Sequence, residues 1–195
     1  MRAVQPHHVE REGWLLLHEV RLRGVFDVES AAIVTALIDA GLVARVPRGL
    51  RVTPVGRDAH AAWARVEPGG ELEAAVERAY QRFLVLNPEL LRLCSDWQVR
   101  PGGTTNDHKD PEYDWAIFDR LSSIDDRVGP LVSSVARSVD RFDGYRARLR
   151  AARQHVEEGA HEWFTSPRID SYHTVWMQLH EDLLLSLGKE RASED

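Results

Sequence analysis

Apolar residues return every three to four positions through most of the chain, which is the spacing of one buried face on a helix. Glycines and prolines interrupt this spacing, because glycine readily closes a helix and proline cannot continue one. Asn87-Pro88 and Gly129-Pro130 are interpreted as two such boundaries. The pattern predicts helices over residues 9–22, 31–41, 56–66, 71–86, 88–98, 113–126, 131–143, 145–158 and 168–187. Asp27 or Ser30 can cap the second of these helices, and Ser166-Pro167 caps the last.

The segment after Gly41 departs from the helical spacing. A short apolar strand leads to a turn at Pro47 to Gly49, a second strand follows, and Thr53-Pro54 opens the next helix. The order is helix, strand, turn, strand, helix. We therefore predict a mainly α fold, with an N-terminal winged helix-turn-helix that carries a two-stranded wing, followed by an all-helical C-terminal region.

One linker signal divides the chain. Glu67-Pro68-Gly69-Gly70 combines three residues that break helices with an acidic residue, between two helical patterns. We predict a domain over residues 1–67 and a helical domain over residues 71–195. The helix over residues 71–86 has a broad apolar stripe, and we expect it to pair two copies of the chain together with helices near the C-terminus.

The charge of the chain is distributed unevenly. The net charge is −6 at pH 7, yet residues 1–66 hold nine Arg or Lys against seven Asp or Glu. No acidic residue lies between Ala40 and Arg57, a segment that contains four arginines: Arg45, Arg48, Arg51 and Arg57. A focused basic hairpin on an acidic protein is typical of a small footprint on the phosphates of double-stranded DNA.

Two segments resemble MarR-like winged-helix transcriptional regulators. They are Leu37-Ile38-Asp39-Ala40-Gly41-Leu42-Val43 and Val52-Thr53-Pro54-Val55-Gly56-Arg57. The resemblance implies a homodimer that binds DNA and senses a small-molecule effector in a helical cleft. It also implies that residues 31–39 approach the major groove, where Thr35 is exposed together with acidic Asp39. Only a turn or a very short helix fits between Gly24 and this helix, so the helix-turn-helix is shorter than the family pattern.

The remainder of the chain resembles the C-terminal region of uncharacterised regulators from actinobacteria. The resemblance extends from residues 80–87 to residues 172–184, and it brings no known chemistry. Candidate sites in this region must therefore be found from the residues themselves.

Histidines and tryptophans of the C-terminal region suggest a ligand pocket. His173 and His180 are seven residues apart and share one helix face with Trp176, but backbones about 10 Å apart do not favour sharing one zinc ion. The loop over residues 106–110 adds Asp107 and His108, close in sequence to Trp97. If this loop folds over the last helix, these side chains line one pocket. The alternatives are histidines bonded within a helical core, a solvated polar loop, or a metal site.

A basic run crosses two of the predicted helices. It contains Arg137, Arg141, Arg146, Arg148, Arg150 and Arg153. Such a run is most often a solvated face, here with Asp140, Asp143 and Glu157 opposing it, and less often a contact for DNA or an anionic ligand.

Other patterns exclude several classes of function. The sequence has no phosphate-binding loop, no dinucleotide-binding glycine motif, no His-Glu-x-x-His motif and no cysteine pair. Catalysis is therefore not favoured, and we predict no cofactor and no metal. Cys94 lies in an apolar run and is predicted to be buried. The chain has no long apolar segment, so we expect a cytoplasmic protein without a membrane partner.

Two alternatives to a DNA-binding regulator remain open at this point. The first is a small-molecule-binding or metal-dependent enzyme built on the helical part, with the winged helix as a docking module. The second is a winged helix that docks on protein and makes no contact with DNA. Neither the operator nor the effector follows from the sequence.

Overall fold

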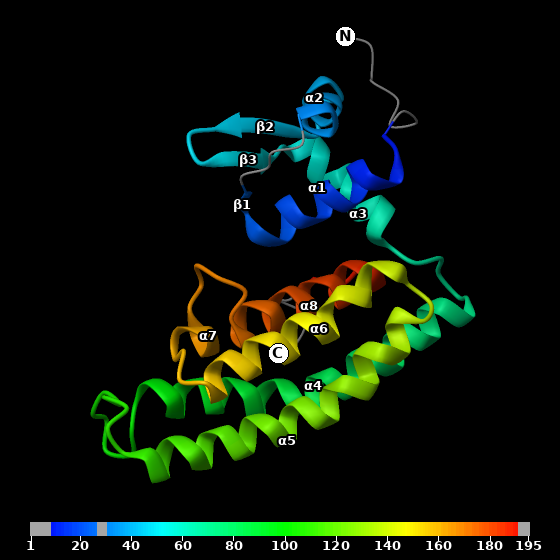
Figure 1. Cartoon of the computed structure of the whole chain (residues 1–195). Coiled ribbons are helices and arrows are strands. Elements are labelled where there is room, and N and C mark those ends of the chain that lie inside the picture. The colour runs from blue at the N-terminus through cyan, green and yellow to red at the C-terminus, as the bar shows by residue number, and fades with distance from the viewer. Residues whose placement is uncertain (1–8, 27–30, 191–195) are drawn as a thin grey trace. The chain divides into compact units, whose positions relative to one another are not determined.

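The computed structural model describes residues 9–26 and 31–190, and these residues are mainly helical (Figure 1). Two compact units are distinguished. The first comprises Met1–Pro68 together with Leu184–Asp195, and the second comprises Gly69–Leu183. The break between Pro68 and Gly69 lies inside the segment that the sequence marks as a linker. The end of the last helix is counted with the first unit, because the Val66 backbone N–H donates to the Ser186 carbonyl at 2.9 Å.

The first unit combines three helices with a small antiparallel sheet. Its elements are α1 (Arg11–Arg23), β1 (Val25–Phe26), α2 (Ala31–Asp39), β2 (Val43–Val46), β3 (Gly49–Val52) and α3 (Pro54–Ala64). The β2–β3 hairpin confirms the predicted pair of strands, but the sheet has three strands in the order β1-β3-β2. The sequence analysis missed β1 because two residues are too few for a strand pattern. The predicted helix caps Asp27 and Ser30 lie outside the described residues.

One junction holds the hairpin against the helices of this unit. Thr53 caps α3 by accepting the Gly56 backbone N–H at 2.9 Å, and its hydroxyl donates to the Gly41 carbonyl at 2.6 Å. A Cβ atom on Gly56 would lie 2.0 Å from the Leu42 carbonyl oxygen, so only glycine fits there. Gly41 itself ends α2 with a positive φ of 69°. These contacts explain why a Thr-Pro-x-Gly sequence follows the hairpin.

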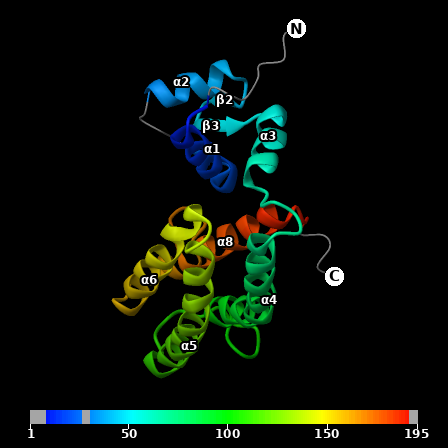
Figure 2. The same ribbon diagram turned by 90° about the vertical axis from the view of Figure 1, so that its right-hand side faces the viewer.

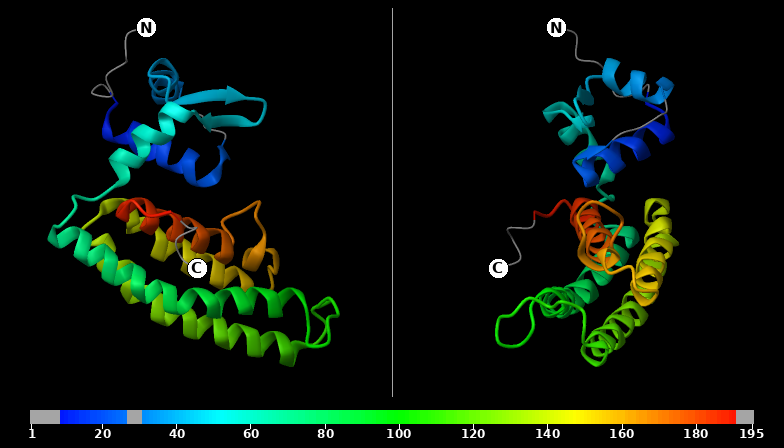
Figure 3. Two further views of the ribbon diagram at one scale, coloured as in Figure 1. Left: turned by 180° about the vertical axis from the view of Figure 1, so that it is seen from behind. Right: turned by 60° about the vertical axis from the view of Figure 1, so that its left-hand side comes forward.

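The second unit is built on two long helices that run side by side, α4 (Glu71–Gln98) and α5 (Pro111–Ala136) (Figures 1 and 3). The predicted boundaries at Asn87-Pro88 and Gly129-Pro130 are wrong, because both prolines lie inside continuous helices. A proline inside a helix costs about 3 kcal/mol. Buried residues continue on both sides of each proline, and the long contact between α4 and α5 offsets that cost.

The shorter elements of the second unit follow α5. They are η2 (Asp140–Phe142), α6 (Asp143–Glu157), α7 (Glu162–Thr165) and α8 (Tyr172–Leu187). The helix predicted over residues 131–143 is corrected, since α5 ends at Ala136. The last helix also begins later than predicted, because the Ser171 hydroxyl rather than Ser166 accepts the Thr174 backbone N–H, at 3.2 Å. Figure 2 shows α6 beside α5.

Two further observations bear on the classes of protein considered above. Among the residues that the structure describes, no helix is both long enough and apolar enough to span a bilayer. Cys94 is buried on α4, as predicted, and burial raises the pKa of its thiol to about 12.

Candidate functional site

The β2–β3 hairpin exposes the arginines that the sequence singles out. Ala44 pairs with Arg51 and Arg45 pairs with Leu50 across the ladder. Paired residues share one face of a sheet, so Arg45 and Arg51 lie on opposite faces. Arg48 lies in the turn between the strands. All three side chains are exposed.

Arg57 extends this group onto the first turns of α3, where it is also exposed. Here Arg45, Arg48, Arg51 and Arg57 are called the exposed arginines. None of the four has a side-chain hydrogen bond or ion pair to a residue that the structure describes. Their charges therefore remain fully available to a binding partner.

A second set of arginines, in η2 and α6, has the opposite surroundings. The predicted solvated face is wrong for these residues, which form ion pairs with acids of α5, α8 and the segment before α8. The pairs are Arg141 with Asp182 at 2.7 Å, Arg146 with Asp125 at 2.7 Å, Arg148 with Asp170 at 2.8 Å, and Arg153 with Asp125 at 3.8 Å and Glu157 at 3.5 Å. We call Arg141, Arg146, Arg148 and Arg153 the ion-paired arginines. Glu157, one of the predicted opposing acids, belongs to these pairs.

The exposed face of α2 carries small and weakly polar residues. Val34 and Leu37 are buried in the core of the first unit, whereas Ala36 and the predicted Thr35 are exposed. Asp39 is also exposed, at the end of the helix. This face can lie close to another surface, but it offers few side chains that could read the edges of base pairs.

The loop between α4 and α5 is held closed at its two ends. Val99 and Thr105 form an antiparallel bridge, and the Arg100 guanidinium pairs with the Asp110 carboxylate. The same guanidinium lies 4.5 Å from the centre of the Tyr113 ring. Hydrogen bonding to Arg100 lowers the pKa of Asp110. These contacts fix the middle of the loop, which contains His108.

His108 lies against a buried carboxylate. Its Nδ1 atom is 3.2 Å from Asp114 Oδ2 and 3.3 Å from Asp114 Oδ1, and Asp114 is buried at the beginning of α5. Asn106 Nδ2 donates to Asp114 Oδ1 at 2.9 Å and to the Trp97 carbonyl at 3.2 Å. Asn106 Oδ1 accepts the His108 backbone N–H at 3.3 Å. The amide of Asn106 therefore fixes both the carboxylate and the histidine.

Aromatic rings surround His108 on its other sides. The ring centres of Trp97 and His108 are 4.0 Å apart, and those of His108 and His161 are 4.6 Å apart. Trp97 is buried, with Phe164 at 5.1 Å. We call Trp97, Asn106, His108, Asp114 and His161 the His108 cluster.

The residues predicted to line one ligand pocket lie in separate parts of the structure. Trp97 and His108 meet, as described, but Asp107 points elsewhere and pairs with Lys109 at 3.3 Å on the surface. Trp176 and His180 are enclosed in the core, with ring centres 4.7 and 4.8 Å from that of Phe83 on α4. His180 has Tyr80 and Phe83 as ring neighbours, whereas His108 has Trp97 and His161.

His173 and Trp176 show how α8 is packed. The Trp176 indole N–H donates to Asn87 Oδ1 at 2.9 Å, next to the proline inside α4. His173 is half-buried, and burial lowers the pKa of its imidazole. His180 therefore lies inside the helical core, whereas His173 lies at its edge.

Sequence reasoning paired His108 with Trp97 but missed Asn106, Asp114 and His161 as its other partners. Asn106 and Asp114 lie two and six residues from it, so their closeness in sequence was a usable signal. His161 lies in another loop, and only the folded chain brings it beside Trp97.

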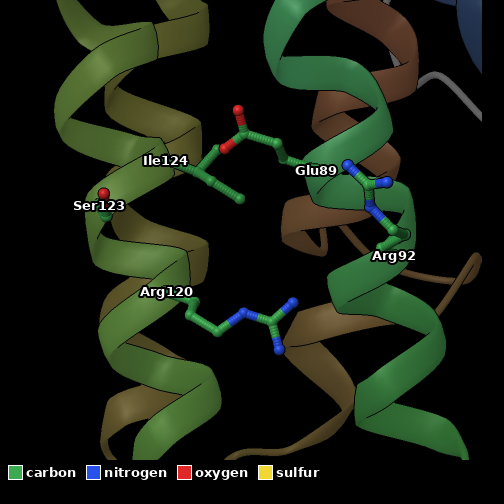
Figure 4. A pocket seen from close by; sticks show the side chains of 5 residues that line it. All are labelled: Glu89, Arg92, Arg120, Ser123 and Ile124. Atoms are coloured by element: carbon green, nitrogen blue, oxygen red, sulfur yellow. The ribbon is translucent and has the colours of Figure 1, made fainter.

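A shallow pocket of about 200 Å³ opens between α4 and α5 (Figure 4). Glu89 and Arg92 of α4 line it together with Arg120, Ser123 and Ile124 of α5, and Glu89, Arg120 and Ile124 point toward the space between the two helices. The charged groups here are already engaged in part, since Arg127 pairs with Glu89 at 2.6 Å and Arg120 pairs with Asp96 at 2.7 Å. Hydrogen bonding to Arg127 lowers the pKa of Glu89.

No group of three or more His, Cys, Asp or Glu side chains is arranged to hold a metal ion within residues 9–26 and 31–190. Comparisons of the chain with protein-family models, with curated proteins and with solved structures found no match. The function must therefore be argued from the two arrangements described above, the exposed arginines and the His108 cluster.

Proposed function

We propose that this protein is a DNA-binding transcriptional regulator whose first unit works as a winged helix. The observation that carries the proposal is the group of exposed arginines, which have no ion pair within the described residues. Arginine binds phosphate through a planar fork of donors, and the phosphate backbone supplies most of the affinity for DNA. The four arginines would release counterions from DNA without first breaking an internal ion pair.

The geometry of the hairpin favours its insertion between phosphates. It is less suited to a hairpin that lies flat on a surface. Arg45 and Arg51 are on opposite faces of the ladder, and Arg48 is at its turn. A hairpin that enters a groove meets phosphates on both faces and at its tip, so each arginine has a partner in that arrangement. Arg57 would hold a neighbouring phosphate from α3.

In this proposal, α2 approaches the major groove. Its exposed Thr35 and Ala36 allow close approach, and Thr35 supplies a hydroxyl and a methyl group. Because Asp39 is acidic, we assign most of the affinity to the hairpin and only limited sequence reading to α2. The resemblance to MarR-like regulators supports the approach of α2 to the major groove.

The proposal includes a homodimer and a small-molecule effector. Val85, Pro88 and Leu91 are exposed at spacings of three along α4, and they form an apolar stripe that begins within residues 71–86, the segment predicted to pair two copies. We propose that the dimer has two conformations that differ in the spacing of the two hairpins. An effector that binds the helical unit better in one of these conformations would shift the population toward it and so change the spacing.

The test is binding to random-sequence duplex DNA, measured by fluorescence anisotropy at two salt concentrations. Light scattering first establishes the oligomeric state of the sample. We expect affinity that falls steeply as salt rises. The double variant Arg48→Ala with Arg51→Ala should weaken binding to all sequences and reduce the slope of log affinity against log salt by about 2, since each lost phosphate contact removes about 0.9.

A matched control removes two positive charges from the other unit. Arg137 and Arg150 are exposed and have no ion pair within the described residues. Replacing both with alanine should leave the affinity and its salt dependence nearly unchanged. If this control loses binding instead, DNA contacts the helical unit. If wild-type protein shows no salt-dependent binding, the proposal fails and a protein-docking role replaces it.

A further inference from the structure

The contacts of Asn106 restrict where the hydrogens of the His108 cluster can lie. Asn106 Nδ2 has two hydrogens, and both are used, one toward the Trp97 carbonyl oxygen at 3.2 Å and one toward Asp114 Oδ1 at 2.9 Å. The reversed amide would direct its oxygen at these two acceptors, so the orientation is fixed by the network. No hydrogen of Asn106 is left for His108 Nδ1, although the two nitrogens are 3.1 Å apart.

Asp114 then determines the tautomer of His108. An ionised carboxylate only accepts hydrogen bonds, and both of its oxygens face His108 Nδ1 at 3.2 and 3.3 Å. Nδ1 must therefore carry a hydrogen. In the neutral ring, the lone pair lies on Nε2.

Nε2 of His108 is reached by solvent. The His108 side chain is 22% exposed, whereas the Asp114 side chain is only 8% exposed. Among the described residues, several histidine nitrogens are buried without a hydrogen-bond partner, and Nε2 of His108 is not one of them. The backbone of His108 has a positive φ of 55°, so the loop holds this ring in place through a sparsely populated conformation.

We propose that His108 is a proton-accepting site for a neutral ligand that offers a weakly acidic hydroxyl group. Nε2 accepts the hydroxyl hydrogen and takes it as a proton when the ligand oxygen becomes negatively charged. Asp114 stabilises the imidazolium that forms, and Asn106 positions Asp114. An anion is a poor ligand here, because Nε2 presents a lone pair rather than a hydrogen. The site lies in the helical unit and does not depend on the DNA-binding proposal.

The first test is the reaction of the full chain with diethyl pyrocarbonate, followed at each histidine by mass spectrometry. Unprotonated Nε2 attacks a carbonyl carbon, an ethyl carbonate group leaves, and the Nδ1 proton is released. We expect His108 to react several-fold faster than His155, which is more exposed at 43% but has Glu158 no closer than 3.8 Å. Reaction at His108 that is equal to or slower than at His155 would overturn the proposal.

Variants separate the positioning role of Asp114 from a general effect of charge. In Asp114→Asn, the new amide can donate to Nδ1 and move the hydrogen to Nε2, so reaction at His108 should slow several-fold. Asp107→Asn removes an exposed carboxylate of the same loop that pairs with Lys109, and it should leave the rate unchanged. Equal rates in both variants contradict the assignment.

A measurement on the unmodified protein covers the case in which Asp114→Asn disrupts the loop. Long-range proton–nitrogen NMR spectra distinguish the two tautomers of a histidine directly. We expect the Nδ1–H form at His108. The Nε2–H form would refute the proposal whatever the variants show.

Discussion

The exposed arginines and the ion-paired arginines have the same side chain and opposite surroundings. Both sets look like basic clusters in the sequence, and both come from segments with periodic apolar residues. The ion-paired arginines meet acids of other elements, such as Asp125 and Asp182, whose side chains are 0% exposed. The exposed arginines meet no acid within the described residues. A basic run therefore indicates a binding surface only when the fold leaves its charges unpaired.

The strongest test of this difference makes the same substitution in both sets of arginines. Arg141→Ala leaves the buried Asp182 carboxylate without its guanidinium, with the Tyr145 hydroxyl still at 3.4 Å. We expect the free energy of unfolding to fall by about 3–5 kcal/mol, the usual cost of removing one partner from a buried ion pair. Arg48→Ala should change it by no more than about 0.5 kcal/mol. Urea denaturation followed by circular dichroism measures both values.

Equally large losses of unfolding free energy in the two variants would show that the hairpin is also part of a stabilising network. Equal small losses would show that the buried pairs of η2 and α6 contribute little. Either result would remove the distinction between the two sets.

The rate at which the Cys94 thiol is labelled gives a second test of the difference between the two sets. Burial raises the pKa of its thiol to about 12, so the native protein should react very slowly with thiol reagents at about pH 8. Labelling then requires opening of the helical unit. Arg141→Ala should accelerate labelling by about 100-fold or more, which is what a loss of 3 kcal/mol implies, whereas Arg48→Ala should not. Fast labelling of the wild-type protein would contradict the buried position of Cys94.

Lowering the pH should have a smaller effect, which is a loss of stability in the helical unit. Burial lowers the pKa of His173 from its usual 6.5, so the folded state holds this proton less tightly than the unfolded state does. The unfolded chain binds more protons below about pH 6.5, and the helical unit should lose stability as the pH falls from there through the folded pKa. The arginines keep their charge throughout this range.

Thermal melting at about pH 7.5 and about pH 5.5 measures this effect, with His173→Gln as the control. The variant should lose part of the difference between the two melting temperatures. A wild-type protein that gains stability on acidification would contradict the sign. Binding of the folded protein to DNA should change little, because His173 lies in the other unit.

Much of the fold could be predicted from local signals. Thr53 and Gly41 mark the ends of helices through contacts within a few residues, and the hairpin follows from the turn at Pro47 to Gly49. The breaks at Pro88 and Pro130 were predicted wrongly, because the penalty of a proline is local but the packing that offsets it is spread along two whole helices.

The candidate site could be predicted only in part. His108 and Trp97 were identified from the density of polar and aromatic residues around one loop. Their convergence with His173 and His180 was an expectation about tertiary contacts, and the structure instead places His161 beside His108. Periodicity along a helix says which residues share a face, but it does not say which other element covers that face.

The sequence by itself determined the mainly helical class, the hairpin and the position of the linker signal. These depend on the apolar spacing and on the backbone preferences of glycine, proline and capping residues, which act over a few positions. Which arginine charges remain available to a binding partner depends on contacts that only the tertiary structure shows. The acids that pair with Arg146, Arg148 and Arg141 lie 21, 22 and 41 residues away in sequence. A charge is neutralised by whatever folding brings within a few ångströms of it, and the order of residues along the chain does not record that distance.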